Sequence, residues 1–193
     1  MDLHITDDVL DAARSGDGDA FAVIWRNLAP SVTGYLRARG VDDAEGVTSD
    51  VFVSLLPKLP EMRGGVAGLR TLTFSIAHAR AVDEARRRAR RPSMVEFDPI
   101  RHDGQEASAE QVAFTRLATT DAHDLLLRLS PDHREVLALR VVADLGLEQT
   151  ATVMGRSVGS IKQLQRRALL ALRAELATDG VTSHSLNAIT GAT

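Results

Sequence analysis

The sequence has no cysteine in 193 residues, only 4% aromatic residues and no long apolar run. Without cysteine there is no disulfide framework, no thiolate zinc site and no thiol nucleophile, which suits a reducing compartment. No apolar run approaches the length that crosses a membrane, and no basic-then-apolar signal opens the chain. These absences predict a soluble cytoplasmic protein without membrane insertion.

Net charge is also small, at −3, so the charge of the whole chain does not point to a nucleic-acid partner. The charges are strongly segregated, however. The first twenty residues hold six Asp and one Arg, whereas residues 78–91 hold six Arg against two acids. Any nucleic-acid surface must therefore be local.

The histidines give no support for an enzyme. His78, His102, His123 and His133 form no His-x-x-x-His pair of the kind that binds metal, and no glycine-rich phosphate loop is present. Solvated or capping roles fit these residues better. We expect a non-enzymatic protein with no cofactor and no metal.

Apolar residues recur at helical spacing along most of the chain, and no β alternation is long enough for a sheet. The clearest pattern in the N-terminal half is Phe21, Ile24, Trp25 and Leu28. The fold class is therefore predicted as all-α.

Two further helices are predicted before residue 92. One begins at Asp42 and Asp43 and ends at Pro57, and the residues 62–68 after it are predicted as a loop. A long helix is expected from Leu69. Its predicted stripe consists of Leu72, Ile76, Ala79 and Asp83.

The long helix ends in the run RRRARR, which Pro92 stops. Such a run supplies charge for a nucleic-acid backbone. A solvated basic helix end, favourable to the helix dipole, is the alternative.

Composition divides the chain into four parts. Residues 1–91 are predicted to form one small helical domain, and residues 92–119 an acidic flexible linker with weak periodicity. A second helical domain is expected over residues 120–177, where Ser130 and Pro131 begin a helix. Residues 178–193 are predicted as a disordered tail.

The stretch 147–172 has the pattern of a helix-turn-helix. Gly155 is the residue type that ends a helix with positive φ, and Ser157 is a good N-cap for a second helix. The apolar face of that helix consists of Ile161, Leu164, Ala168 and Leu172. Residues 155–174 hold five Lys or Arg and no acid, which favours the DNA major groove over an ordinary pair of core helices.

Together these stretches resemble the extracytoplasmic-function sigma factors, which are small two-domain bacterial transcription initiation factors. The most specific part is EQTATVMGRSVGSIKQLQRRALLAL (148–172), preceded by LSPDHREVLALR (129–140). Residues 43–52 are similar to the helix with which these factors hold RNA polymerase. Residues 76–91 are similar to the helix that engages the promoter −10 element.

The resemblance implies a sigma region 2-like domain, a linker and a region 4-like domain in a protein of the bacterial cytoplasm. Such a factor binds core polymerase, at the β′ clamp helices and the β flap, and then reads promoter DNA at two elements and opens it. The resemblance also implies an anti-sigma partner. The loop 63–68 would shape a pocket for a flipped base.

The resemblance assigns roles to three sets of residues. The −35 element would be read by Arg156, Ser157, Ser160, Lys162, Gln163, Arg166 and Arg167. The −10 element would be held by Arg63, Arg80, Asp83, Arg86, Arg87, Arg88, Arg90 and Arg91. Polymerase would be bound by Asp42, Asp43, Glu45, Asp50 and Phe52.

Two other functions fit the sequence. A conventional helix-turn-helix regulator would bind an operator without holding core polymerase, and a helical adaptor would bind protein alone. Co-purification with core polymerase distinguishes the first from a sigma factor. Charge reversal at Arg166 and Arg167 would leave an adaptor unaffected.

Overall fold

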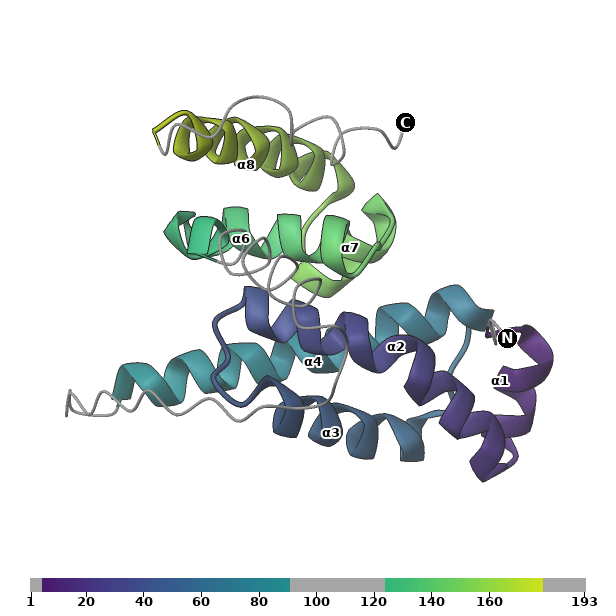
Figure 1. Ribbon diagram of the computed structural model, residues 1–193. Helices are drawn as coiled ribbons and strands as arrows, with labels where there is room; N and C mark the ends of the chain where they lie inside the picture. Colours follow the sequence, from purple (N-terminus) through teal and green to yellow (C-terminus); the bar gives the residue numbers. More distant parts are fainter. Residues whose placement is uncertain (1–4, 91–123, 179–193) are drawn as a thin grey trace, which may run out of the picture.

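The computed structural model describes residues 5–90 and 124–178, and its regular elements in these ranges are all helical, with no strand (Figure 1). The predicted all-α class is therefore confirmed. The predicted linker 92–119 and residues 179–193 of the predicted tail lie outside the described residues. None of the described helices is both long and apolar enough to cross a membrane.

Residues 5–90, the N-terminal helices, hold four α-helices and one short 3₁₀ turn. They are α1 (Asp7–Arg14), α2 (Gly18–Ala38), α3 (Ala44–Leu55), η1 (Leu56–Lys58) and α4 (Gly65–Arg90). Asp17 caps α2, because its Oδ1 accepts from two backbone N–H groups, and Asp43 caps α3 through Gly46 N at 2.9 Å. Helix α2 continues through Pro30 without a break.

Aromatic rings from three of these helices lie in the core. Phe52 of α3 is 1% exposed and packs between two rings of α2, with centroids 4.5 Å from Trp25 and 6.3 Å from Phe21. Tyr35 of α2 meets Phe74 of α4 edge to face at 5.7 Å. The aromatic residues of α2, α3 and α4 therefore join α2 to α3 and α4.

Helix α4 differs from its predicted form in two respects. It begins at Gly65, four residues before the expected start. The predicted stripe is wrong, because Ala79 and Asp83 are exposed and Leu72 and Ile76 are half-buried. The buried face consists of Leu69, Thr73, Phe74, Ala77 and Ala81. Thr73 tolerates full burial because its hydroxyl donates to the Leu69 carbonyl at 2.8 Å.

Residues 124–178, the C-terminal helices, begin with a helical stretch over 124–128. The elements that follow are α6 (Pro131–Leu137), the π-helical turn η2 (Ala138–Val142), α7 (Leu147–Met154) and α8 (Val158–Thr178). Ser130 caps α6 and Pro131 occupies its first turn, as predicted. Helix α6 passes directly into η2, so residues 131–142 are helical throughout.

The two groups of helices pack together in layers. In Figure 1, α6 and α7 lie between α8 on one side and α2 with α4 on the other, and α3 covers the far side of α4. Residues from η2, from α7 and from the turn between them belong to the same apolar cluster as the N-terminal core, among them Ala138, Leu139, Leu145 and Val153. A smaller cluster joins α6, α7 and α8. The N-terminal helices and the C-terminal helices thus share a continuous apolar core.

Candidate nucleic-acid interface

The turn between α7 and α8 has the geometry that its residues predict. Gly155 is left-handed at φ 62° and ends α7, and its N–H bonds the Thr152 carbonyl at 3.3 Å. Ser157 Oγ accepts from Ser160 N at 3.2 Å, which caps the start of α8. The helix-turn-helix is therefore confirmed as local structure.

Helix α8 turns one face to the C-terminal core and a basic face to solvent. Ile161 and Ala168 are fully buried, and Leu164 and Leu172 pack against the same cluster. The residues left exposed include Lys162, Gln163, Arg166 and Arg167. Because no acid occurs between residues 155 and 174, this face carries positive charge that no acid of α8 itself neutralises there.

Among the predicted −35 residues, Arg156 pairs with an acidic side chain of α6. Its Nη2 donates to Asp132 Oδ2 at 2.6 Å, and both side chains are substantially exposed. An exposed pair of this kind is worth about 0–1 kcal/mol, so a phosphate could replace the carboxylate at little cost.

Three arginines near the end of α4 lie close to acidic side chains, which the sequence analysis did not predict. Arg87 pairs with Glu84 at 2.6 Å, and Arg86 lies 3.9 Å from Asp83. Arg88 donates to the Gly40 carbonyl and to Asp42. Arg91 lies outside the described residues.

Two further residues of the predicted −10 set, Arg80 and Arg90, also lie on α4. Arg80 is half-buried and donates to Ser54 Oγ of α3 at 2.9 Å, so it also ties α4 to α3. Arg90 is exposed at the end of α4.

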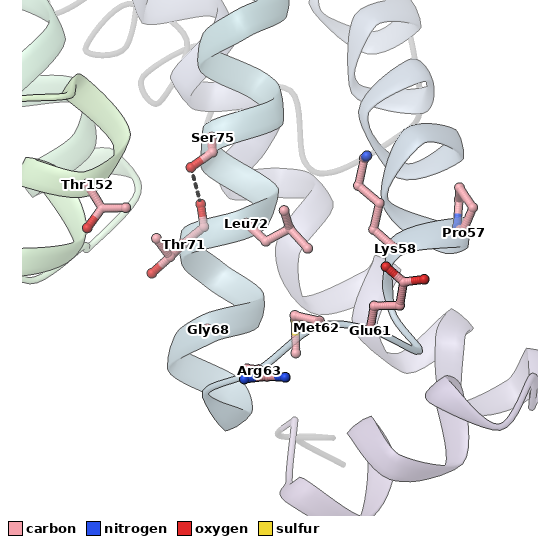
Figure 2. Close-up of a pocket in the computed structure, with 10 residues that line it drawn as sticks. All are labelled: Pro57, Lys58, Glu61, Met62, Arg63, Gly68, Thr71, Leu72, Ser75 and Thr152. Atoms are coloured by element: carbon pink, nitrogen blue, oxygen red, sulfur yellow. Dashed lines mark hydrogen bonds between the residues drawn. The ribbon is translucent and has the colours of Figure 1, made fainter.

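Arg63 borders a hollow of about 690 Å³ between α4 and the segment that precedes it (Figure 2). The lining residues are Pro57, Lys58, Glu61, Met62, Arg63, Gly68, Thr71, Leu72, Ser75 and Thr152. Arg63 and Gly68 bound the stretch for which a base pocket was predicted, but only its first residues form a loop, because residues 65–68 belong to α4. Thr152 reaches the hollow from α7, so the C-terminal helices form one of its borders.

The predicted polymerase residues lie just before α3 and along it, and all but one of them are exposed. Asp42, Asp43, Glu45 and Asp50 are exposed, and Glu45 pairs with Arg37 of α2. Phe52 is buried in the core between α2 and α3, so its assignment as a surface contact is wrong. The apolar residue that α3 does expose is the next one, Val53, at 72%.

Sequence reasoning missed a buried polar cluster where α6 meets α2 and α4. Glu135 of α6 is 3% exposed, and its Oε1 accepts from the Tyr35 hydroxyl at 2.6 Å and lies 3.1 Å from His78 Nδ1. Its Oε2 lies 2.6 Å from Arg39 Nε, paired by charge rather than through an aligned hydrogen bond. We call Tyr35, Arg39, His78 and Glu135 the interdomain latch.

The latch shifts two ionisations. Burial raises the pKa of the Glu135 carboxyl, but the hydrogen bond from His78 and the charges of Arg39 and His78 outweigh it, so the pKa lies below its ordinary value. Burial, followed by the nearby Glu135 charge, raises the pKa of the Tyr35 hydroxyl well above its ordinary value. Both shifts favour an ionised Glu135 carboxylate that accepts a hydrogen bond from the protonated Tyr35 hydroxyl.

Comparison with known proteins agrees with these features. The family model "Sigma-70, region 4" matches residues 125–174. ECF RNA polymerase sigma factor SigD of Mycobacterium tuberculosis is 31% identical over 181 residues, which cover 90% of this chain and 85% of SigD. ECF RNA polymerase sigma factor ShbA of Streptomyces griseus is 30% identical, with 84% of this chain and 90% of ShbA covered.

A solved structure of CnrH in complex with the cytosolic domain of CnrY shares the fold, with a TM-score of 0.66 and 21% identity over 91% of this chain and 99% of that one. Sequence identity to SigD and ShbA, together with the region 4 match on the helix-turn-helix, shows the family. The chain belongs to the ECF RNA polymerase sigma factors, the non-enzymatic proteins that bind core polymerase and direct it to promoters.

Proposed function

We propose that this factor reads its promoters at two points, with α8 at the −35 element and α4 with the adjoining hollow at the −10 element. The observation that carries the proposal is the separation of the two basic surfaces onto different helices, one before and one after the segment 91–123. Because the chain belongs to a family that binds core polymerase, the alternative of a conventional regulator that acts without polymerase is not favoured.

At the −35 element, Lys162, Gln163, Arg166 and Arg167 would face bases and phosphates from the exposed side of α8. Arg and Gln can bond base edges in the major groove, whereas Lys and Arg also neutralise phosphates. The backbone at residues 157–160, at the start of α8, would lie near the sugar-phosphate chain.

At the −10 element, the exposed arginines at the end of α4 supply charge for one separated strand. Their pairs with Asp83, Glu84 and Asp42 are exposed, so phosphates could replace these acids at a cost of about 1 kcal/mol or less each. The hollow beside Arg63 would receive a flipped base. It contains no aromatic side chain, so polar and backbone groups would hold the base.

Core polymerase would be held by the exposed face of α3, through Asp43, Glu45 and Asp50, on the β′ clamp helices. The C-terminal helices would rest on the β flap. We also infer an inhibitory protein partner of the anti-sigma kind, because CnrH, whose fold this chain shares, was solved in complex with the cytosolic domain of CnrY. Isolation of the tagged factor from its host tests this point, since such a partner must both co-purify and suppress run-off transcription.

Run-off transcription with purified core polymerase on a promoter library tests the two-point reading. Arg166→Glu with Arg167→Glu should reduce promoter-directed transcripts at least about a hundredfold, because two phosphate or base contacts become repulsive. Binding to core polymerase should remain within twofold of the wild-type value.

Arg173→Glu is the matched control, since it reverses an exposed arginine of the same helix outside the predicted set. It should keep most of the transcription, with Arg166→Glu alone as the single-site comparison. Loss of core binding in the double variant would show that the surfaces are misplaced.

A further inference from the structure

We infer that Arg14 of α1 positions one wall of the hollow beside α4 and thereby sets which base the hollow accepts. The wall is formed by residues 59–64, which we call the wall loop; it leads from η1 to α4 and contributes Glu61, Met62 and Arg63 to the lining. This inference rests on the proposed capture of a flipped base in the hollow. Arg14 lies outside the lining that the structure describes, so it would act through the loop without touching the base.

Helix α1 is held firmly by the N-terminal core. Leu10 and Ala13 are 1% and 3% exposed and belong to the same apolar cluster as Leu59, the first residue of the wall loop. Thr6 caps the helix, because its Oγ1 accepts from Val9 N at 3.3 Å. The helix packs against α2 and against α4 (Figure 1). It is therefore a rigid support from which a side chain can hold the loop.

Arg14 uses this support to hold the backbone of the wall loop. Its Nη2 donates to the Met62 carbonyl at 2.7 Å, and its Nη1 donates to Asp11 Oδ1, one turn earlier in α1, at 3.0 Å. Asp11 thus orients the guanidinium, and the guanidinium orients the carbonyl. An arginine holds two acceptors at fixed angles because its donors form a planar fork, whereas the ammonium of lysine is a single point.

The cost of placing Arg14 here argues that its bond does more than attach α1. Among the described residues, the Nε of Arg14 is buried and has no hydrogen-bond partner. A buried donor without a partner is unfavourable, and the apolar contacts of Leu10 and Ala13 already attach the helix to the core. What Arg14 adds is a directed bond to one carbonyl of the wall loop.

The wall loop ends in residues that do not fix its path. Gly64 and the next residue, Gly65, have φ of 92° and 58°, and glycine adopts such angles and many others at small cost. Just before them, the Met62 N–H donates to the Leu59 carbonyl at 3.2 Å. The bond from Arg14 takes the carbonyl of the same residue. Both polar backbone groups of Met62 are therefore held where the glycines begin.

The other side of the wall loop leaves almost no space for adjustment. A Cβ placed on Gly68 of α4 would overlap the Arg63 carbonyl oxygen, so the loop backbone runs directly against the helix. Met62, Arg63 and Gly68 lie together at one end of the hollow (Figure 2). Arg63 is thus restrained by Gly68 on one side and, through Met62, by Arg14 on the other. Loss of the Arg14 bond removes one of these two restraints.

Base selection in this hollow depends on accurate positions. The lining has no aromatic side chain, so a base would be held by hydrogen bonds rather than by stacking. Stacking accepts every base, whereas a hydrogen bond weakens once donor and acceptor leave the range of about 2.7–3.2 Å. A shift of about 1 Å in the wall loop would therefore reduce the preference for one base and still allow a base to enter.

Base preference is the measurement that separates positioning from stability. Run-off transcription with core polymerase is measured on promoters that carry each of the four bases in turn at every −10 position. Arg63→Met identifies the position that the hollow reads, because the preference changes there. At that position Arg14→Met should reduce the ratio of the best base to the next at least about fivefold. Preferences at the other −10 positions and at the −35 element should stay within twofold.

Three further variants control for a general loss of stability. Arg14→Lys should lose less than half as much preference as Arg14→Met, because an ammonium can still donate to the Met62 carbonyl. Arg26→Met removes an exposed arginine of α2, and Leu36→Ala removes a fully buried side chain in the last turn of α2. Both should leave the base ratio within twofold, whatever the total amount of transcript. Core binding by Arg14→Met should stay within twofold of wild type.

Hydrogen exchange tests the restraint without DNA. In the free full-length chain, the Met62 amide, which donates to the Leu59 carbonyl, should exchange at least about tenfold faster in Arg14→Met than in wild type. Arg26→Met should leave that rate unchanged. An unaltered Met62 rate in Arg14→Met would overturn the restraint itself, independently of any promoter result.

The outcomes distinguish this inference from the proposed function. If Arg63→Met alters the base preference and Arg14→Met does not, the inference is overturned and the base pocket stands. Equal losses of preference in Arg14→Met and Leu36→Ala would also overturn it, because reduced stability would then be the cause. If Arg63→Met alters no preference at any −10 position, the hollow is not the base pocket, and this part of the proposed function fails together with the inference.

Discussion

Phe52→Ala tests whether residue 52 supports the core or contacts polymerase. The side chain is 1% exposed and packs against Trp25 at 4.5 Å and Phe21 at 6.3 Å between ring centroids. Removing a fully buried phenyl ring costs about 3–5 kcal/mol, of which the aromatic contacts contribute about 0.5–1.5 kcal/mol. Since domains are stable by about 5–15 kcal/mol in total, the variant should fold but with a strongly reduced free energy of unfolding.

Urea unfolding followed by far-UV circular dichroism measures this loss, and Trp25 fluorescence reports the local environment because the chain has a single tryptophan. Val53→Ala is the matched control, since Val53 is the adjacent residue and is 72% exposed. Its free energy of unfolding should change by less than about 0.5 kcal/mol.

Core binding is measured on both variants under conditions where each is folded. Phe52→Ala should then bind core polymerase within a few-fold of wild type. A loss of less than about 1 kcal/mol in stability, combined with at least tenfold weaker core binding, would refute the core assignment and restore residue 52 to the polymerase surface.

Three further predictions follow from other parts of the structure. Gly155→Ala should lower the free energy of unfolding by about 1–2 kcal/mol in urea, because φ is 62° there while an added Cβ meets no atom within 4 Å. Gly155→Asn should lower it less, and an equal loss in both variants would contradict an effect of backbone conformation alone. Asp50→Lys should weaken core polymerase binding at least fivefold in a titration, whereas Asp19→Lys at the start of α2 should not; equal losses would place the docking surface elsewhere. The partners of Glu135 in the interdomain latch lower its pKa from an ordinary value of 4.5, so this carboxylate stabilises the packing of the two groups of helices above pH 4.5, and the stabilisation is lost as the pH falls through the lowered value. A radius of gyration that stays constant over this range would contradict a controlling role for Glu135.

Local signals in the sequence predicted the helix-turn-helix well. Gly155 and Ser157 act through their own backbone or through a neighbour three residues away, so their roles need no knowledge of the rest of the fold. Ile161 and Ala168 are buried as the helical spacing predicts. The same reasoning located the N-terminus of α6 at Ser130 and Pro131.

Helix α4 shows where the same reasoning fails. Large apolar residues at 72 and 76 suggested one face, but the core took the face that carries Leu69, Thr73 and Phe74. Thr73 reads as polar in sequence, yet its hydroxyl is satisfied within the helix and its methyl group packs inward. The ring of Phe74, which meets Tyr35 of α2, decides the orientation through a contact that only the folded chain contains.

Phe52 and Glu135 are two buried residues whose burial local sequence patterns did not predict. Phe52 lies in a stretch similar to a polymerase-binding helix, and that likeness describes the helix without saying which of its faces is buried. Glu135 lies among charged residues and reads as a solvated side chain, whereas three partners, each more than fifty residues away in sequence, bury it. Charged groups are rarely buried unless they are paired, so their burial depends on long-range partners that local patterns do not contain. Sequence reasoning therefore missed Glu135 as the charged residue that joins the C-terminal helices to the N-terminal helices.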